Sequence, residues 1–253
     1  MVRNLLVRGM LAGLIAAALA LVFAWIFGEP QVGAAIALEG HAGHAAHATE
    51  AAAEAVAAEP EPVSRGVQST VGLATAVGVY GVAVGGVFAL VFAFVYGRLG
   101  AFGARATSVL IALGAFVTVE LVPFLKYPAN PPAVGDPGTI GRRTVVYFAL
   151  VLISVLLAVA ALYVGRRLAP RYGNWNATLL ALAGFLAAVV VVCLLMPVVD
   201  EVPAGFPAAL LWKFRLASLG TQAVLWSGIG LAFGTLAERA FSPYRAPVSS
   251  SAV

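Results

Sequence analysis

Six stretches of about 20 predominantly apolar residues recur along the chain, and they constrain its fold more than any other feature. A helix needs about 20 apolar residues to cross a hydrocarbon core about 30 Å thick. Of the 253 residues, 62% are hydrophobic and only 10% are charged, whereas soluble domains carry roughly a quarter charged residues. We therefore predict an all-α, polytopic membrane helix bundle. The six predicted spans are residues 5–27, 70–96, 106–125, 145–164, 177–196 and 216–236.

The predicted bundle forms a single transmembrane domain over residues 1–244, followed by a flexible cytoplasmic tail at 245–253. The first apolar run resembles a signal peptide because Arg3 and Arg8 precede it. We predict a retained helix instead, because the run exceeds the roughly 7–15 residues of a signal-peptide core. Most loop Lys and Arg residues fall on one side of the predicted membrane, which favours both termini in the cytoplasm.

Two sequence patterns suggest how the helices are arranged. The third and fifth spans end alike, in "LVPFLKYPANPP" (121–132) and "LMPVVDEVPAGFP" (195–207). This similarity suggests three in–out–in hairpins related by a pseudo-repeat, although similar loop requirements explain it equally well. Glycines four residues apart let helix backbones approach closely. They occur at Gly9/Gly13, Gly81/Gly85 and Gly230/Gly234.

Several function classes find no support in the sequence. The formal net charge of +4 comes from basic residues dispersed among loops, so it does not indicate nucleic-acid binding. The sequence has no GxxxxGK[ST] phosphate loop, no HExxH motif and no Ser/His arrangement. We therefore predict neither an ATPase nor another enzyme, and no permanently bound cofactor.

The chain's three histidines stand at three-residue spacing in "EGHAGHAAHATE" (39–50), within a predicted low-complexity outer loop at 39–63. On a helix, His41, His44 and His47 would fall within about 120° of one face. Imidazole suits cobalt, nickel, copper and zinc. The tract is therefore a candidate metal-capture loop, although such tracts also bind metal adventitiously.

Glu120 is the one formally charged residue well inside a predicted span. An intramembrane carboxylate is expensive and usually faces a partner or an aqueous cavity. Two interpretations stay open: a buried ion pair with Arg143 or Arg215, or a place on a cation path.

The outer loops hold the other polar candidates. Prolines stiffen "KYPANPPAVGDPGTIGRR" (126–143) and glycines permit its turns, which indicates either a structured mouth or a rigid turn. The candidate transport path comprises Glu120, Lys126, Asn130, Asp136, Arg142, Arg143, Asp200, Glu201, Arg215 and Gln222. Cys193 and Met196 are candidate soft ligands, with packing as the alternative. Arginines at helix N-termini suit anions better than bare cations.

Three segments together resemble a known family. They are "RGVQSTVGLATAVGVYGVAVGGVFALVFAFVYGRLG" (65–100), "LVPFLKYPANPPAVGDPGTIGRRTVVYF" (121–148) and "DEVPAGFPAALLWKFRLASLGTQAVLW" (200–226). Their combination resembles the CbtA family of proposed cobalt transporter subunits, which is often described with five spans.

The resemblance implies Co²⁺ as substrate, uptake linked to vitamin B12 biosynthesis, and a bacterial cytoplasmic (inner) membrane location. It also implies a small single-span CbtB-type partner, beside the lipid bilayer itself; self-association into a homo-oligomer is left open. The alternative function is a non-transporting accessory protein whose arginine-rich outer face holds an anionic ligand, a lipid head group or a partner.

Overall fold

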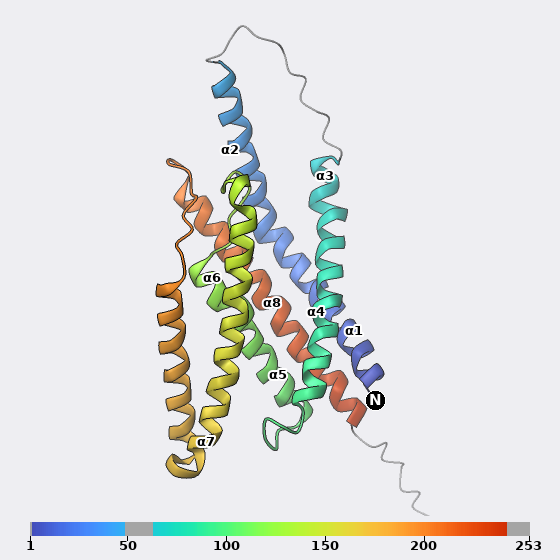
Figure 1. Ribbon diagram of the computed structural model, residues 1–253. Helices are drawn as coiled ribbons and strands as arrows, with labels where there is room; N and C mark the ends of the chain where they lie inside the picture. The colour runs from blue at the N-terminus through green and yellow to red at the C-terminus, as the bar shows by residue number, and fades with distance from the viewer. Residues whose placement is uncertain (1, 49–62, 242–253) are drawn as a thin grey trace, which may run out of the picture.

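The computed structural model describes residues 2–48 and 63–241, and the regular elements of these residues are all helical (Figure 1). The predicted tail at 245–253 and residues 49–62 of the predicted outer loop lie outside the described residues. The helices are α1 (Val2–Phe23), α2 (Glu29–Ala48), α3 (Arg65–Val67), α4 (Leu73–Val95), α5 (Ala104–Ala115), α6 (Val122–Lys126), α7 (Ile140–Leu195) and α8 (Ala208–Phe241).

Short π-helical turns join several of these helices into continuous helical segments. They lie at Ala24–Gly28, Gln68–Gly72 and Phe116–Leu121. α1 thus continues into α2, so the start of the predicted histidine loop is helical through Ala48. At 1.5 Å per residue this continuous helix is about 70 Å long, well beyond the hydrocarbon core.

Five helices of the described residues are long and apolar enough to cross a membrane, so the predicted count of six separate helices is wrong, and the folded-back α7 supplies two of the predicted spans. The predicted fourth and fifth spans both lie in α7, which stays helical except at Gly173. Gly173 has φ +77°, a conformation that glycine adopts without a Cβ clash. α7 therefore turns back on itself at its lower end instead of being interrupted by a loop (Figure 1).

Glycines bring the central helices into close contact. α1 packs against α4 and α8, and α5 packs against the other side of α8. A Cβ built on Gly81 of α4 would lie 2.5 Å from the Ala17 Cβ of α1. A Cβ on Gly230 of α8 would lie 2.7 Å from the Ala112 Cβ of α5. These glycines therefore lie at helix–helix contacts, as their spacing predicts.

Buried side chains form two hydrophobic clusters. The larger one lies among α1, α4, α5 and α8, and includes Phe92 and Phe233. The smaller one joins α6 to the two arms of α7 through Val122, Leu150 and Phe185. α8 packs mainly with the first group, and the three-hairpin pseudo-repeat stays a prediction.

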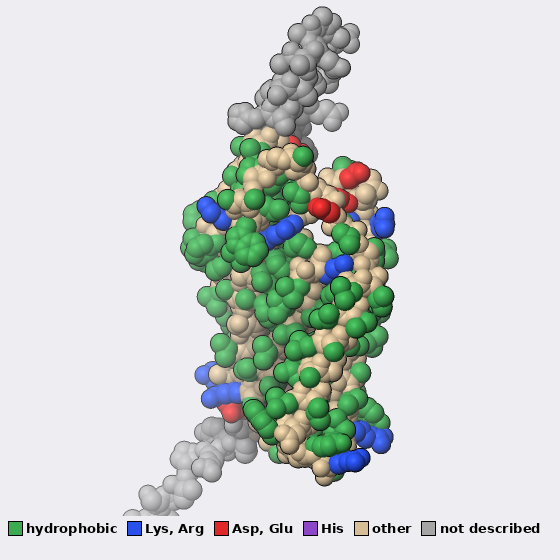
Figure 2. Space-filling model, turned by 90° about the vertical axis from the view of Figure 1, so that its left-hand side faces the viewer, with side chains coloured by type: hydrophobic (Ala, Val, Ile, Leu, Met, Phe, Trp, Pro, Cys, Tyr) green, Lys and Arg blue, Asp and Glu red, His purple; other side chains and the backbone are tan. Residues whose placement is uncertain are grey.

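The exterior carries a broad apolar belt with charged side chains gathered at its two ends (Figure 2). The start of α1 and the end of α8 share the lower end of Figure 1, where the Arg8 guanidinium donates to the Leu236 carbonyl. The loops at 127–139 and 196–207 lie at the upper end. Such a belt matches a bilayer-embedded protein, and the sidedness of the two ends stays a prediction.

Candidate functional site

A cavity of about 580 Å³, here called the upper cavity, lies among α6, the first arm of α7, α8 and the two upper loops. Its wall combines aromatic and aliphatic side chains with charged and amide groups. Seven of the predicted path residues line it: Glu120, Asn130, Arg143, Asp200, Glu201, Arg215 and Gln222. The fold thus gathers residues from five separate elements around one space.

Glu120 belongs to the π-helical turn Phe116–Leu121, which interrupts the regular hydrogen bonding between α5 and α6. Pro123, two residues into α6, has no amide N–H to continue that pattern. The buried Ser154 of α7 donates its hydroxyl to the Thr118 carbonyl in the same turn. This bond fixes the turn against α7 and so positions Glu120. Turns of this kind are frequent at functional sites.

Neutral donors hold the Glu120 carboxylate, which is only 8% exposed. The Trp226 indole N–H donates to Oε1 at 3.3 Å, and the Tyr80 hydroxyl makes a longer contact with the same oxygen at 3.5 Å. Ion pairs of the described residues join Arg65 to Glu29, Arg105 to Glu238 and Arg143 to Glu201. Glu120 belongs to none of them. Both of these donors reach Oε1, so the second oxygen, Oε2, accepts a hydrogen bond from neither.

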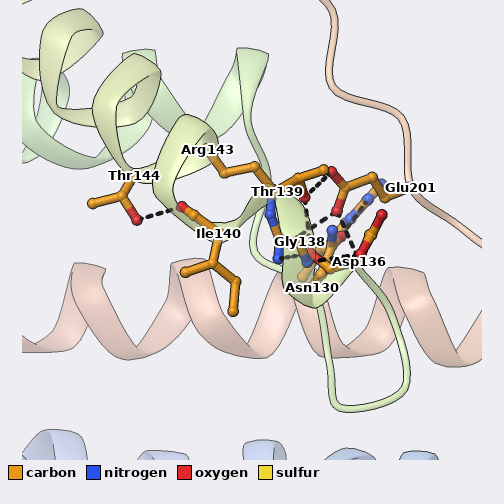
Figure 3. Close-up of polar contacts among 9 residues, drawn as sticks. Asn130, Asp136, Gly138, Thr139, Ile140, Arg143, Thr144 and Glu201 are labelled. Carbon is orange, nitrogen blue, oxygen red and sulfur yellow. Dashed lines mark hydrogen bonds and ion pairs between the residues drawn. The ribbon is translucent and has the colours of Figure 1, made fainter.

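An ion pair and two hydrogen bonds tie the two upper loops together at Glu201 (Figure 3). The Thr139 hydroxyl donates to Oε1 at 2.5 Å, the Asp136 amide N–H donates to Oε2 at 3.0 Å, and Arg143 Nη1 lies 3.2 Å from Oε2. The hydroxyl, the amide and the guanidinium all favour the ionised form and lower the pKa of Glu201. At neutral pH the negative charge of Glu201 is therefore matched within the protein.

Arg215 of α8 holds the first upper loop from the opposite side. Its Nη2 donates to Asn130 Oδ1 at 2.9 Å, and its Nε donates to the Ala129 carbonyl at 3.3 Å. The Tyr127 hydroxyl then donates to the Pro197 carbonyl of the second loop at 2.7 Å. These hydrogen bonds join the two loops at the opening of the upper cavity, so the loops are not independent of one another.

Two buried polar atoms in the cavity wall have no hydrogen-bond partner within residues 2–48 and 63–241: Arg143 Nε and Gln222 Oε1. Buried polar atoms without a protein partner are normally satisfied by water or a ligand. One of these atoms is a donor and the other an acceptor. The cavity therefore has unused hydrogen-bonding capacity for a hydrated guest.

The remaining candidates lie outside the cavity wall. Asp136 contributes through its backbone N–H and accepts from the Gly138 N–H at 2.8 Å with its own carboxylate. Lys126 and Arg142 do not line the cavity. Cys193 is partly buried, and Met196 packs against the α6–α7 cluster.

The three histidines occupy α2 beyond the upper loops. At 1.5 Å per residue their positions lie about 18–27 Å farther along the helix than Glu29. Their side chains lie outside the described residues. Among the described side chains, no group of three His, Cys, Asp or Glu residues lies close enough together to hold a metal ion.

Sequence reasoning missed the two donors to Glu120. Tyr80 and Trp226 lie inside apolar runs, away from the membrane interfaces where such residues gather. A buried Tyr hydroxyl or Trp N–H normally finds a hydrogen-bond partner. Each Tyr or Trp inside a predicted span could therefore have been considered as a hydrogen-bond donor to Glu120.

The family model described as "Probable cobalt transporter subunit (CbtA)" matches residues 2–238. No curated protein and no solved structure matches the chain. The match covers nearly the whole chain, including every element that lines the upper cavity. The chain belongs to the CbtA family.

Proposed function

We propose that this CbtA-family chain conducts Co²⁺ inward as the membrane subunit of an uptake transporter, with the upper cavity as its entrance. One observation carries the proposal: Glu120, buried within a membrane-spanning helix, forms part of the wall of a cavity that also reaches the polar upper loops. Carboxylates inside membranes are costly and mark ion pathways. Neutral donors orient Glu120, and the ion pairs found among the described residues do not include it.

The expected setting is the bacterial cytoplasmic membrane, with both termini inside and the upper loops outside. Asp200 and Glu201 would then stand where an incoming cation arrives. A divalent ion moving inward gains about 4.6 kcal/mol per 100 mV of membrane potential, enough for roughly a 2,000-fold concentration ratio. The potential therefore supplies a driving force without an ATPase domain. The imported metal would supply vitamin B12 biosynthesis.

The arginines around the cavity favour transport over the alternative of a non-transporting protein that holds an anion. Arg143 is paired with Glu201, and Arg215 donates to Asn130 and the Ala129 carbonyl. Glu201 therefore matches the charge of Arg143, and the two remaining carboxyl groups of the wall, Glu120 and Asp200, outnumber Arg215. A transport path also needs sites that bind the ion weakly enough to release it. A wall with few free carboxylates meets this requirement.

Further subunits are part of the proposal. The family description names a subunit, and we expect a small single-span CbtB-type protein as partner, with homo-oligomerisation as an alternative. We expect no catalytic activity. The histidine positions on α2 would serve as an optional capture segment above the entrance, separate from the path at Glu120.

Uptake of labelled cobalt tests the proposal. Cells lacking other cobalt importers should accumulate the label when they express this chain with its partner, and Glu120→Gln should reduce the rate. Glu238→Gln is the matched control, because Glu238 pairs with Arg105 at the opposite end of the bundle. The proposal is wrong if expression of the chain, with or without the partner, leaves uptake at the background level.

A further inference from the structure

We propose that the upper cavity admits its cation as the intact aqua ion, and that the wall binds the ion's water ligands instead of the metal itself. The inference rests on the proposed function, which it makes specific: the substrate at the entrance is a hydrated divalent cation. Three properties of the cavity support it: its size, the protein hydrogen bonds that its carboxylates already accept, and the acceptor atoms that remain free for a guest.

The cavity is much larger than a bare ion requires. Six water molecules occupy about 180 Å³ at roughly 30 Å³ each, whereas the cavity measures about 580 Å³. A hexahydrated ion therefore fits with its complete first shell and with further water around it. An ion stripped of water would instead need a close ring of protein ligands to replace that shell.

The carboxylates of the wall are poorly placed to replace water on a metal. Both oxygens of Glu201 already accept protein hydrogen bonds, from Thr139 on one side and from Asp136 on the other. Direct coordination by Glu201 would compete with these bonds and with the Arg143 pair. Glu120 has one oxygen engaged by Trp226 and Tyr80, which leaves a single oxygen for the cavity.

Three acceptors of the wall match the outer surface of an aqua ion. Metal-bound water donates hydrogen bonds outward, so its neighbours must be acceptors. Glu120 Oε2 and the Asp200 carboxylate supply charged acceptors, and the buried, unpartnered Gln222 Oε1 supplies a neutral one. These groups come from the Phe116–Leu121 turn, the second upper loop and α8, so they approach the guest from different sides.

Recognition through the water shell depends on the charge and hydrated size of the ion, and much less on ligand softness. Co²⁺ and Ni²⁺, both octahedral as aqua ions, should therefore enter the cavity about equally well. Selection between them would have to occur at another point of the pathway or in the partner.

Hexaamminecobalt(III) provides the direct test, because its six ammines do not exchange and only outer contacts are available to it. Binding of this complex is measured by equilibrium dialysis on the full chain in phosphatidylcholine nanodiscs, with Co²⁺ as competitor. We expect saturable binding that Co²⁺ displaces. Glu120→Gln and, separately, Asp200→Asn should each weaken it about 10-fold, the effect of one charge-assisted hydrogen bond. Glu238→Gln should leave it unchanged.

The visible spectrum of bound Co²⁺ gives a second measurement. An aqua ion keeps the weak octahedral absorption, whereas direct coordination by protein ligands in a tetrahedral site gives intense bands. Intense bands in the wild-type chain, or failure of hexaamminecobalt(III) to bind and compete, would overturn the inference even if cells import cobalt. Competitive binding that depends on Glu120, in a chain that imports no cobalt, would uphold it and refute transport alone.

Discussion

Replacing Gly81 with alanine should force α1 and α4 apart and destabilise the bundle. The added Cβ would lie 2.5 Å from the Ala17 Cβ and 2.7 Å from the Gly13 carbonyl oxygen, whereas ordinary contact begins at 3.4 Å. The helices must therefore separate by about 0.9 Å at this point, because neither a Cβ nor a backbone carbonyl can rotate away. Overpacking of this kind costs about 1–3 kcal/mol.

Gly78→Ala is the matched control, one turn earlier on α4, because a Cβ there meets nothing within 4 Å. Alanine improves helix propensity by up to about 1 kcal/mol at both positions, so the difference between the variants isolates the packing cost. We expect Gly81→Ala to be less stable than Gly78→Ala by about 1–3 kcal/mol. Unfolding by SDS in mixed micelles, followed by circular dichroism, measures this difference.

The same substitution should also lower cobalt uptake, because Tyr80 is adjacent to Gly81 and its hydroxyl lies 3.5 Å from Glu120 Oε1. Displacement of α4 would lengthen this contact in Gly81→Ala and leave it unaltered in Gly78→Ala. Equal SDS midpoints for the two variants would refute the argument that backbone contact at Gly81 stabilises the bundle.

Three further changes test the upper end of the molecule. The pKa of Glu201 is lowered from 4.5, so its stabilising contribution is complete above that pH and lost as the pH falls through the lowered value. Thermal melting should separate wild type from Glu201→Gln at pH 7, and the difference should shrink as the pH is lowered below 4.5. Gly135→Ala should lower the melting temperature, because Gly135 has φ +122° and its Cβ would lie 2.6 Å from Arg143 Nη1; an unchanged melting temperature would contradict this. Cobalt binding in the cavity, measured by equilibrium dialysis, should survive the triple alanine variant of His41, His44 and His47; its loss would place the site on α2.

Hydrophobicity alone was sufficient to predict an all-helical membrane protein, because the span length is set by the bilayer. It was insufficient to count the helices, since the polar segment between residues 164 and 177 has the composition of a loop but folds as helix on both sides of Gly173. Exposed arginines and asparagines at a membrane surface are compatible with helix, so composition there could not distinguish a loop from a continued helix.

The site was predictable where local chemistry is unusual and unpredictable where it depends on distant contacts. Glu120 is identifiable because a carboxylate in an apolar run is rare. Its partners come from α4 and α8, about 40 and 106 residues away, and no local pattern joins them. The pairing of Arg143 with Glu201 likewise depends on how the two upper loops meet, which the sequence alone leaves open among several acids.

The two hydrophobic clusters place Glu120 at the boundary between two packing units. Trp226, which donates to Glu120, belongs to the cluster of α1, α4, α5 and α8, whereas Ser154, which holds the Thr118 carbonyl, extends from α7 beside the α6–α7 cluster. Packed units move against one another more readily than they deform internally. A shift of α7 relative to α8 would therefore change the cavity and the surroundings of Glu120 together. The Arg143–Glu201 pair links the start of α7 to the loop that follows it, so that loop would move with α7, whereas Arg215 ties the first upper loop to α8.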